Sequence, residues 1–345
     1  MLRILLALVV PAALLASGFS FQASAADVLT AAKVVKPPKL EAGASDAAWS
    51  KAKPLTIQLA GGANFKDGGT TATLKAVYSG DMFYMLVQYA DPTQSARRSP
   101  YQKQPDGSWK KLSDPDDKGG DNNKYYEDKY ALIWNINNSI KGVNEQGCMA
   151  VCHAGEAGKP FGNKYTASDG ELGDIWHMKS VRTAPVGQTD DQYLDNTRYD
   201  KEKSPEAGRK SDPKTGGGYS DVKLVDGKPE LMHKSGVAAN KKGGTYYLKE
   251  ADKAAFDDSK FKPGDEVASI MIAPLTGDRG DIATAASWKN DKWTSVMSRK
   301  LVTGSKYDVQ FDNLDGTYHF GLAAFDNAAV RHAFHVGSLK LKFAK

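Results

Sequence analysis

Residues 73–89 have the sequence TLKAVYSGDMFYMLVQY. Two runs rich in β-branched and aromatic residues, Thr73–Ser79 and Met82–Tyr89, flank the short polar segment Gly80-Asp81. Runs of this kind on either side of a tight glycine-containing turn predict a β-hairpin. The hairpin indicates that regular structure in this chain is built from antiparallel strand pairs.

Further runs of the same character occur along the chain. They are Asp128–Ile136, Glu266–Ala273, Lys292–Arg299, Tyr307–Phe311, Thr317–Phe325 and Val336–Phe343. Two stretches between them, 91–127 and about 140–263, are rich in Gly, Pro and charged residues and show little periodicity. Short strands with turn signals and no clear amphipathic helix predict an all-β fold, an antiparallel β-sandwich with long irregular insertions.

The N-terminus has the features of a secretory leader. Arg3 supplies a positive start, Ile4–Ala16 is apolar, and Ala23-Ser24-Ala25 has the small residues of a cleavage site. We expect residues 1–25 to be a cleaved signal peptide and residues 26–345 to form one exported, periplasmic domain. No later run approaches the roughly 20 apolar residues that a membrane-spanning helix requires.

Composition excludes some classes of function. The formal charge of +5 is modest for 345 residues, and no basic stripe with interleaved aromatic residues occurs, so nucleic acid binding is not expected. No phosphate-binding glycine loop or hydrolase signature is found. The acidic pair Asp190-Asp191 lacks the spaced pattern of a calcium loop, and we expect it on the solvated surface.

The segment Cys148-Met149-Ala150-Val151-Cys152-His153 contains both cysteines of the chain. Two thiols followed directly by a histidine are typical of covalent haem attachment, in which the thiols add to the porphyrin vinyl groups and the histidine ligates the iron. The usual motif has two residues between the cysteines, and this one has three. A short disulfide, which an oxidising compartment favours, and a zinc site are the alternatives.

Several segments together resemble the haem-binding family of the ethylbenzene dehydrogenase and dimethylsulfide dehydrogenase γ subunits. They are Trp49 with its lead-in, Tyr89–Thr93, Glu127–Asn135, Asp174–Lys179, Arg182, Gly277–Ile282, Trp288, Trp293, Arg299–Leu301 and Phe325–Asn327. The resemblance implies a β-sandwich that holds one haem in its long insertion and passes electrons. Those γ subunits bind haem b through Met and Lys ligands. The attachment motif at Cys148, Cys152 and His153 departs from them and indicates a c-type branch with one covalent haem c.

The iron of such a haem needs a second axial ligand. We expect His177, which follows the attachment motif within the same insertion, with His332, His335 and Met271 as alternatives. Trp176 is expected to wall the haem pocket, and Arg182 to contact a propionate, because guanidinium binds carboxylates bidentately. The structural alternatives are a histidine that caps a strand, a surface ion pair for Arg182 and a core position for Met271.

These features predict an exported monohaem c-type cytochrome. It would transfer single electrons to or from a periplasmic redox partner, a molybdenum oxidoreductase or another cytochrome, without being an enzyme itself. Two alternatives remain. One is a non-haem β-sandwich binding module with a Cys148–Cys152 disulfide, and the other is a haem enzyme or gas sensor with an open distal site.

Overall fold

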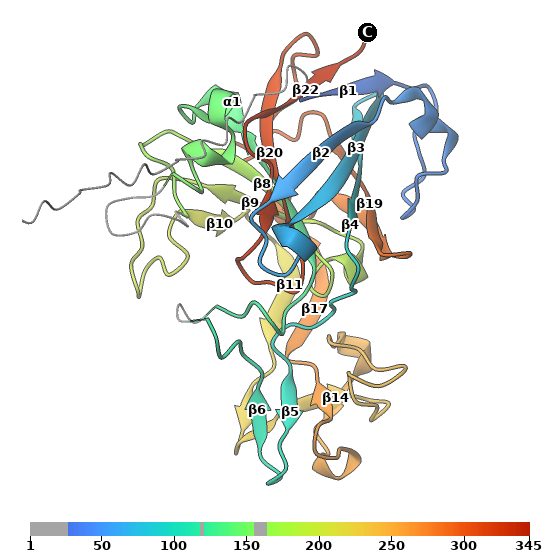
Figure 1. Ribbon diagram of the computed structural model, residues 1–345, viewed down its shortest axis with the longest axis vertical. Helices are drawn as coiled ribbons and strands as arrows, with labels where there is room; N and C mark the ends of the chain where they lie inside the picture. Colours follow the sequence, from blue (N-terminus) through green and yellow to red (C-terminus); the bar gives the residue numbers. More distant parts are fainter. Residues whose placement is uncertain (1–26, 118–120, 155–163) are drawn as a thin grey trace, which may run out of the picture.

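The computed structural model describes residues 27–117, 121–154 and 164–345, so the predicted leader lies outside the described residues (Figure 1). Within these ranges one sheet has 13 strands. They are β1 Val28–Lys33, β2 Leu55–Ala60, β3 Gly69–Ser79, β4 Met82–Ala90, β7 Lys129–Asn135, β8 Gly173–Lys179, β9 Asp190–Leu194, β10 Arg209–Ser211, β18 Ala283–Trp288, β19 Lys292–Lys300, β20 Tyr318–Phe325, β21 Ala333–Phe334 and β22 Leu339–Phe343. The short helix α1 spans Val143–Gln146.

The sheet folds into two layers. One layer has the order β10-β9-β8-β7-β20, and the other has the order β2-β3-β4-β19-β18. Strand β20 reaches the second layer through β21 and β2, and through β22 and β1, which pairs with β3. Neighbours are antiparallel except β1, which runs parallel to both β22 and β3. The predicted all-β antiparallel sandwich is confirmed, and so is its hairpin, in which Ser79 of β3 pairs with Met82 of β4.

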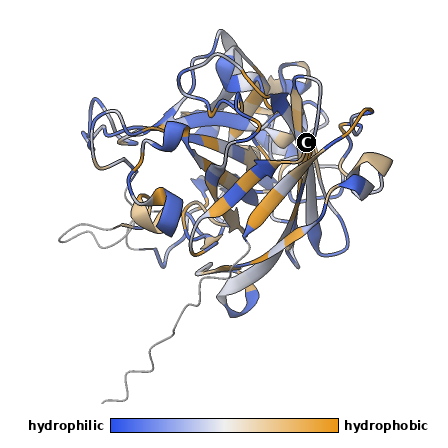
Figure 2. Ribbon diagram, turned by 90° about the horizontal axis from the view of Figure 1, so that it is seen from above, coloured by the Kyte–Doolittle hydropathy of each residue, from blue (hydrophilic) through white to orange (hydrophobic). Residues whose placement is uncertain are grey.

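Alternating side chains fill the space between the layers, because successive residues of a strand point to opposite faces. The inward residues of β7 are Tyr130, Leu132 and Trp134, and those of β4 are Phe83, Met85, Val87 and Tyr89. The Trp176 ring of β8 lies 6.2 Å from Phe83 and 5.1 Å from Trp134, measured between ring centroids. Figure 2 shows hydrophobic and hydrophilic positions alternating along the strands, with hydrophilic loops around them.

The remaining strands form small sheets outside the sandwich. They are β5 Tyr101–Lys103, β6 Trp109–Lys111, β11 Gly216–Asp221, β12 Leu224–Val225, β13 Lys228–Pro229, β14 Leu231–His233, β15 Lys253–Ala255, β16 Glu266–Val267 and β17 Ile270–Thr276. Strands β5, β6 and β14 lie in a lobe at the lower end of Figure 1, which has its own apolar cluster around Trp109 and Phe261. No helix in the described ranges is long and apolar enough to cross a membrane.

One expectation about local structure is wrong. Residues 307–311 form no strand, although Val309 and Phe311 are buried. The stretch 140–263 contains β8 and β9, and all of β8 is buried. The charged residues of these strands made them resemble surface segments in the sequence. In the fold these charges are paired in the interior. The extent of the domain, residues 26–345, stays a prediction.

Candidate functional site: an apolar cavity on the outer face of the sheet

The layer that contains β7, β8 and β20 is covered on its outer face as well as on its inner face. The outward residues are Ala131 and Ile133 of β7, Ile175 and His177 of β8, and Gly321, Ala323 and Phe325 of β20. Together with the segments that cover them they enclose a cavity of about 230 Å³. The remaining lining residues are Cys148, Cys152, His153, Lys164, Leu194, Arg209, Ala329, Val330, His332 and Phe334, with Leu132 at the sheet. The walls are mainly apolar.

A short covering segment, Val143–His153, closes one side of the cavity. It packs on the sheet through Val143, Cys148 and Val151. Gly147 has a φ of +58°, and a Cβ at this position would lie 1.9 Å from the Gly337 carbonyl oxygen. Only glycine therefore allows the covering segment to lie this close to the backbone at Gly337.

Gly321 of β20 allows the same close approach beneath Cys148. A Cβ on Gly321 would lie 2.2 Å from Cys148 Sγ. The covering segment therefore rests directly on the sheet at this point.

Both cysteines are free thiols, so the Cys148–Cys152 disulfide of the binding-module alternative is absent from the structure. Burial raises the pKa of Cys152 to about 11 and that of Cys148 further. Thiols with such raised pKa values are protonated at neutral pH and unreactive. Here the two side chains serve as small apolar wall residues.

Two histidines meet at the cavity. His153 Nε2 and His332 Nε2 lie 3.4 Å apart, and the His153 ring stacks on Phe334 with 4.0 Å between centroids. Burial, followed by repulsion from His153, lowers the pKa of His332 to about 4. Burial also lowers the pKa of His153. Both rings are therefore neutral at pH 7.

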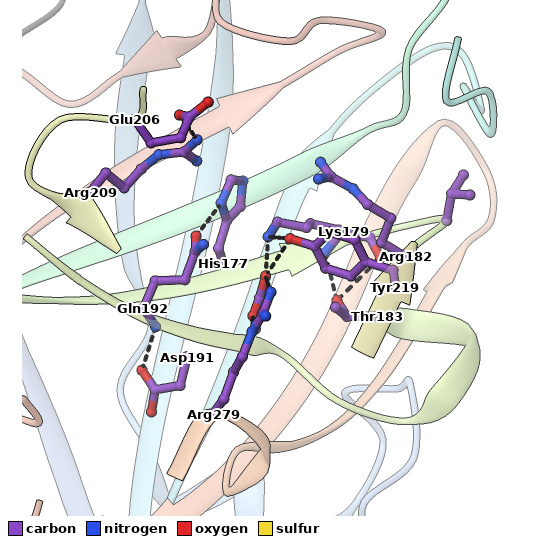
Figure 3. A network of polar contacts seen from close by, with 12 residues as sticks. His177, Lys179, Arg182, Thr183, Asp191, Gln192, Glu206, Arg209, Tyr219 and Arg279 are labelled. Atoms are coloured by element: carbon purple, nitrogen blue, oxygen red, sulfur yellow. Dashed lines mark hydrogen bonds and ion pairs between the residues drawn. The ribbon is translucent and has the colours of Figure 1, made fainter. Parts of the chain in front are cut away.

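His177 lies on the opposite wall, beside a buried charge network (Figure 3). Its Nδ1 lies 3.2 Å from Gln192 Oε1, which accepts a hydrogen bond from it and leaves Nε2 without a partner among the described residues. Burial, with the positive charge of Lys179 two residues further along β8, holds the pKa of His177 well below its usual range. His177 thus offers a neutral acceptor to the cavity.

The network itself joins β8, β9 and the loop before β18. The Asp190 carboxylate binds Lys179 and accepts hydrogen bonds from Arg279 Nε at 2.6 Å and from the Tyr219 hydroxyl at 3.0 Å. The surrounding cations lower the pKa of Asp190 despite its burial. Asp190 and Asp191 are both fully buried, so the expectation of a solvated surface for this pair is wrong.

Two cations that line the cavity form ion pairs with the same carboxylate. Arg209 Nη2 lies 2.5 Å and Lys164 Nζ 3.1 Å from Glu206 Oε2. One carboxylate therefore serves two cations. In addition, the buried Arg209 Nε has no partner among the described residues.

The structure brings five of the predicted site residues to this cavity: Cys148, Cys152, His153, His177 and His332. It does not bring the other four there. Trp176 precedes His177 on β8, so the strand alternation turns it into the sandwich core. Arg182 binds Glu127, His335 Nε2 lies 3.5 Å from Asp27, and Met271 packs in the lower lobe.

Sequence reasoning missed Arg209, Phe334 and the Lys179–Asp190–Arg279 network. The one local signal was the charged ends of the Asp174–Lys179 strand, which is otherwise apolar. A charge at a buried strand position indicates a buried partner, but its identity depends on contacts far away in the sequence.

The contact between Gly321 and Cys148 makes the first prediction. We expect Gly321→Ala to lower the free energy of unfolding by about 1–3 kcal/mol, because the added methyl overlaps the sulfur. In a Cys148→Ala background the same change should cost much less, since the sulfur is gone. Urea unfolding of the four proteins measures the coupling, and strictly additive effects would contradict the contact.

The low pKa of His332 makes the second prediction. The pKa of His332 is about 6.5 in the unfolded chain and about 4 in the folded chain, so the folded chain binds fewer protons between these pH values. The free energy of unfolding therefore decreases as the pH falls from 6.5 through about 4. The shift corresponds to about 3 kcal/mol. We expect His332→Gln to remove most of this part of the acid destabilisation, as measured by urea unfolding at pH 7 and pH 4. A variant that loses as much stability as the parent between these pH values would disprove the assignment.

The solved structures found by comparison are β-sandwiches. A family 9 carbohydrate-binding module from Caldicellulosiruptor kristjanssonii in complex with glucose has a TM-score of 0.35 and 8% identity, over 92% of this chain and 95% of that chain. The same module with cellotriose has a TM-score of 0.33 and 8% identity, over 92% and 93%. A proposed carbohydrate-binding protein from Bacteroides uniformis also has a TM-score of 0.33 and 8% identity, over 92% and 99%. No curated protein matches the chain.

The prediction of a monohaem c-type cytochrome, with haem c bound through Cys148, Cys152 and His153, is wrong. The cysteine spacing differs from the usual attachment motif by one residue. The cavity of about 230 Å³ is smaller than the pockets of about 300–1,000 Å³ that enclose drug-sized ligands, a size class to which a porphyrin belongs. The redox partner predicted with the haem stays a prediction.

A family model described as ethylbenzene dehydrogenase matches residues 46–337. This match covers both layers of the sandwich, the lower lobe and every wall of the cavity. The resemblance predicted from the sequence is confirmed, and the chain belongs to the ethylbenzene dehydrogenase family.

Proposed function

We propose that the chain is a non-haem β-sandwich binding module that takes a small aromatic acid in the cavity between β7, β8 and β20. The observation that carries this proposal is the unpartnered Nε of Arg209, a residue that lines a mainly apolar cavity. Sites for small molecules usually combine apolar walls with a few placed polar groups, and this cavity has that composition.

The apolar walls favour a ring over a polar chain. Ile133, Ile175 and Phe325 come from three adjacent strands, and Phe334 of β21, which pairs with β20, also lines the cavity. A sugar ring carries hydroxyl groups around its rim, and each would lose water here without gaining a partner. A flat hydrocarbon ring buries its faces against these side chains without that cost.

The charge at the mouth favours an anion on that ring. Arg209 and Lys164 share the carboxylate of Glu206, and Arg209 Nε has no hydrogen-bond partner among the described residues. A ligand carboxylate can accept a hydrogen bond from Arg209 Nε and still leave the pair with Glu206 in place, because guanidinium has five N–H donors in a fixed fork. His177 Nε2 supplies an acceptor deeper in the cavity for a ligand hydroxyl.

The third prediction tests this proposal with 1-naphthoate and its neutral analogue 1-naphthamide. We expect 1-naphthoate to bind with a Kd at least tenfold lower than that of the amide, as measured by isothermal titration calorimetry. Arg209→Gln should abolish this preference and leave binding of the amide unchanged, and Ala323→Leu should weaken both, because it fills the cavity.

Arg198→Gln is the matched control, because Arg198 lies over Tyr165 beside the cavity without lining it. Equal binding of the two compounds, or binding of glucose in their place, would contradict the proposal.

We also propose that residues 1–25 are a cleaved signal peptide and that the module works in the periplasm. The leader pattern at Arg3, Ile4–Ala16 and Ala23-Ser24-Ala25 supports this assignment. The fourth prediction is that the protein recovered from the periplasmic fraction of a Gram-negative host begins at Ala26, as read by N-terminal sequencing. Ala25→Tyr should block processing, and a cytoplasmic full-length product from the parent sequence would disprove the proposal.

A further inference from the structure

A second polar centre lies on the inner face of β8 and β9, behind the cavity wall. Carboxylate oxygens of Asp174, Asp191 and Asp308 all lie within 4.8 Å of one another. These three residues are between 0% and 1% exposed. They come from β8, from β9 and from the loop before β20, so the fold gathers them from distant parts of the chain.

One cation faces this group in the described part of the chain. Arg299 Nη1 lies 3.0 Å from Asp174 Oδ2, 3.6 Å from Asp308 Oδ2 and 4.0 Å from Asp191 Oδ2. The guanidinium packs over the Trp176 ring at 4.6 Å. Arg299 therefore approaches the Oδ2 atoms of the three aspartates. Its single positive charge balances only part of the negative charge of these carboxylates.

A fourth buried aspartate adjoins this group. Asp212, just after β10, is 2% exposed, and neither of its side-chain oxygens has a hydrogen-bond partner among the described residues. The Asp212 N–H donates a hydrogen bond to the carbonyl oxygen of Asp191 at 3.2 Å, which places Asp212 beside the group. The oxygens Asp174 Oδ1, Asp191 Oδ2 and Asp308 Oδ1 also have no hydrogen-bond partner there. An unpaired polar atom in a dry interior is costly, so this number of free oxygens at one point indicates an absent partner.

Asp308 also borders a second cleft. A cleft of about 380 Å³ is lined by Asp308 together with Ile136, Asn137, Ser139, Gly170, Leu172, Ser305, Lys306 and Gln310. This cleft shares no lining residue with the apolar cavity.

We propose that Asp174, Asp191, Asp212 and Asp308 bind one calcium ion. Calcium takes six to eight oxygen ligands at about 2.3–2.6 Å, so two of its ligands stand up to about 5 Å apart, in agreement with the separation within this group. The carboxylates outnumber the single guanidinium of Arg299, and a divalent cation would balance part of this excess of acidic groups. Magnesium needs a stricter octahedral geometry and zinc prefers nitrogen and sulfur ligands, so the oxygen-only group favours calcium.

The fifth prediction uses the mature full-length chain, freed of metal with EGTA and then given CaCl₂ alone. We expect one Ca²⁺ per chain by isothermal titration calorimetry and a rise in Tm of at least about 3 °C, because an ion that binds only the folded chain stabilises it. Asp212→Asn and Asp191→Asn should each raise the Kd for Ca²⁺ at least tenfold.

The matched control is Asp91→Asn. Asp91 is also fully buried, with an unpartnered Oδ2, but it belongs to a separate group with Asp128 and Asp326. It should leave calcium affinity unchanged. Loss of binding in this variant, with binding retained in Asp212→Asn, would place the ion elsewhere and overturn the proposal.

Terbium luminescence covers the case in which an aspartate variant fails to fold. Tb³⁺ bound at this site should be excited through Trp176, which packs on Arg299, and Ca²⁺ should displace it. Trp176→Phe should reduce the emission, and Trp293→Phe, next to Asp128, should not. Absence of both calcium heat and terbium emission from the folded parent chain would show that protons, not a metal, hold the carboxylates together.

Discussion

Strands β7, β8 and β20 are buried on both faces, and this constraint determines most of the structure around them. An antiparallel sheet commonly leaves one face to water. Here the inner face carries the aromatic sandwich core, and the outer face carries Ile133, Ile175 and Phe325 beneath a covering segment. A polar group on these strands therefore has little access to water, so it must find a partner inside the protein or face a ligand.

The buried ion pairs follow from this constraint. Lys179 meets Asp190, Arg182 meets Glu127, and Arg299 meets the aspartate group. Removal of one member of such a pair typically costs about 3–5 kcal/mol, because the other charge is left buried and unpaired, although the intact pair adds little net stability. These pairs are better understood as devices that set the register of β8 and β9 against their neighbours.

The same physics explains what could be predicted from the sequence. The β3–β4 hairpin and strands β7 and β20 have local signals, namely β-branched and aromatic runs bounded by turns, and they form as expected. Strands β8 and β9 were hidden because their buried charges resemble a surface pattern, and the neutralising residues lie many positions away. Cys148, Cys152 and His153 were correctly grouped, but the spacing of a motif could not establish a porphyrin.

Trp176 and His177 lie on opposite faces of β8, one in the sandwich core and the other at the cavity. They are adjacent in the sequence. The pairing of β8 with β9 extends this separation: Asp190, Gln192 and Leu194 lie on the outer face, and Asp191 lies on the inner face with Asp174. The cavity and the aspartate group thus stand back to back on two shared strands. Whatever fixes the inner carboxylates also fixes the strands that hold the outer wall, because neither face can shift without the other.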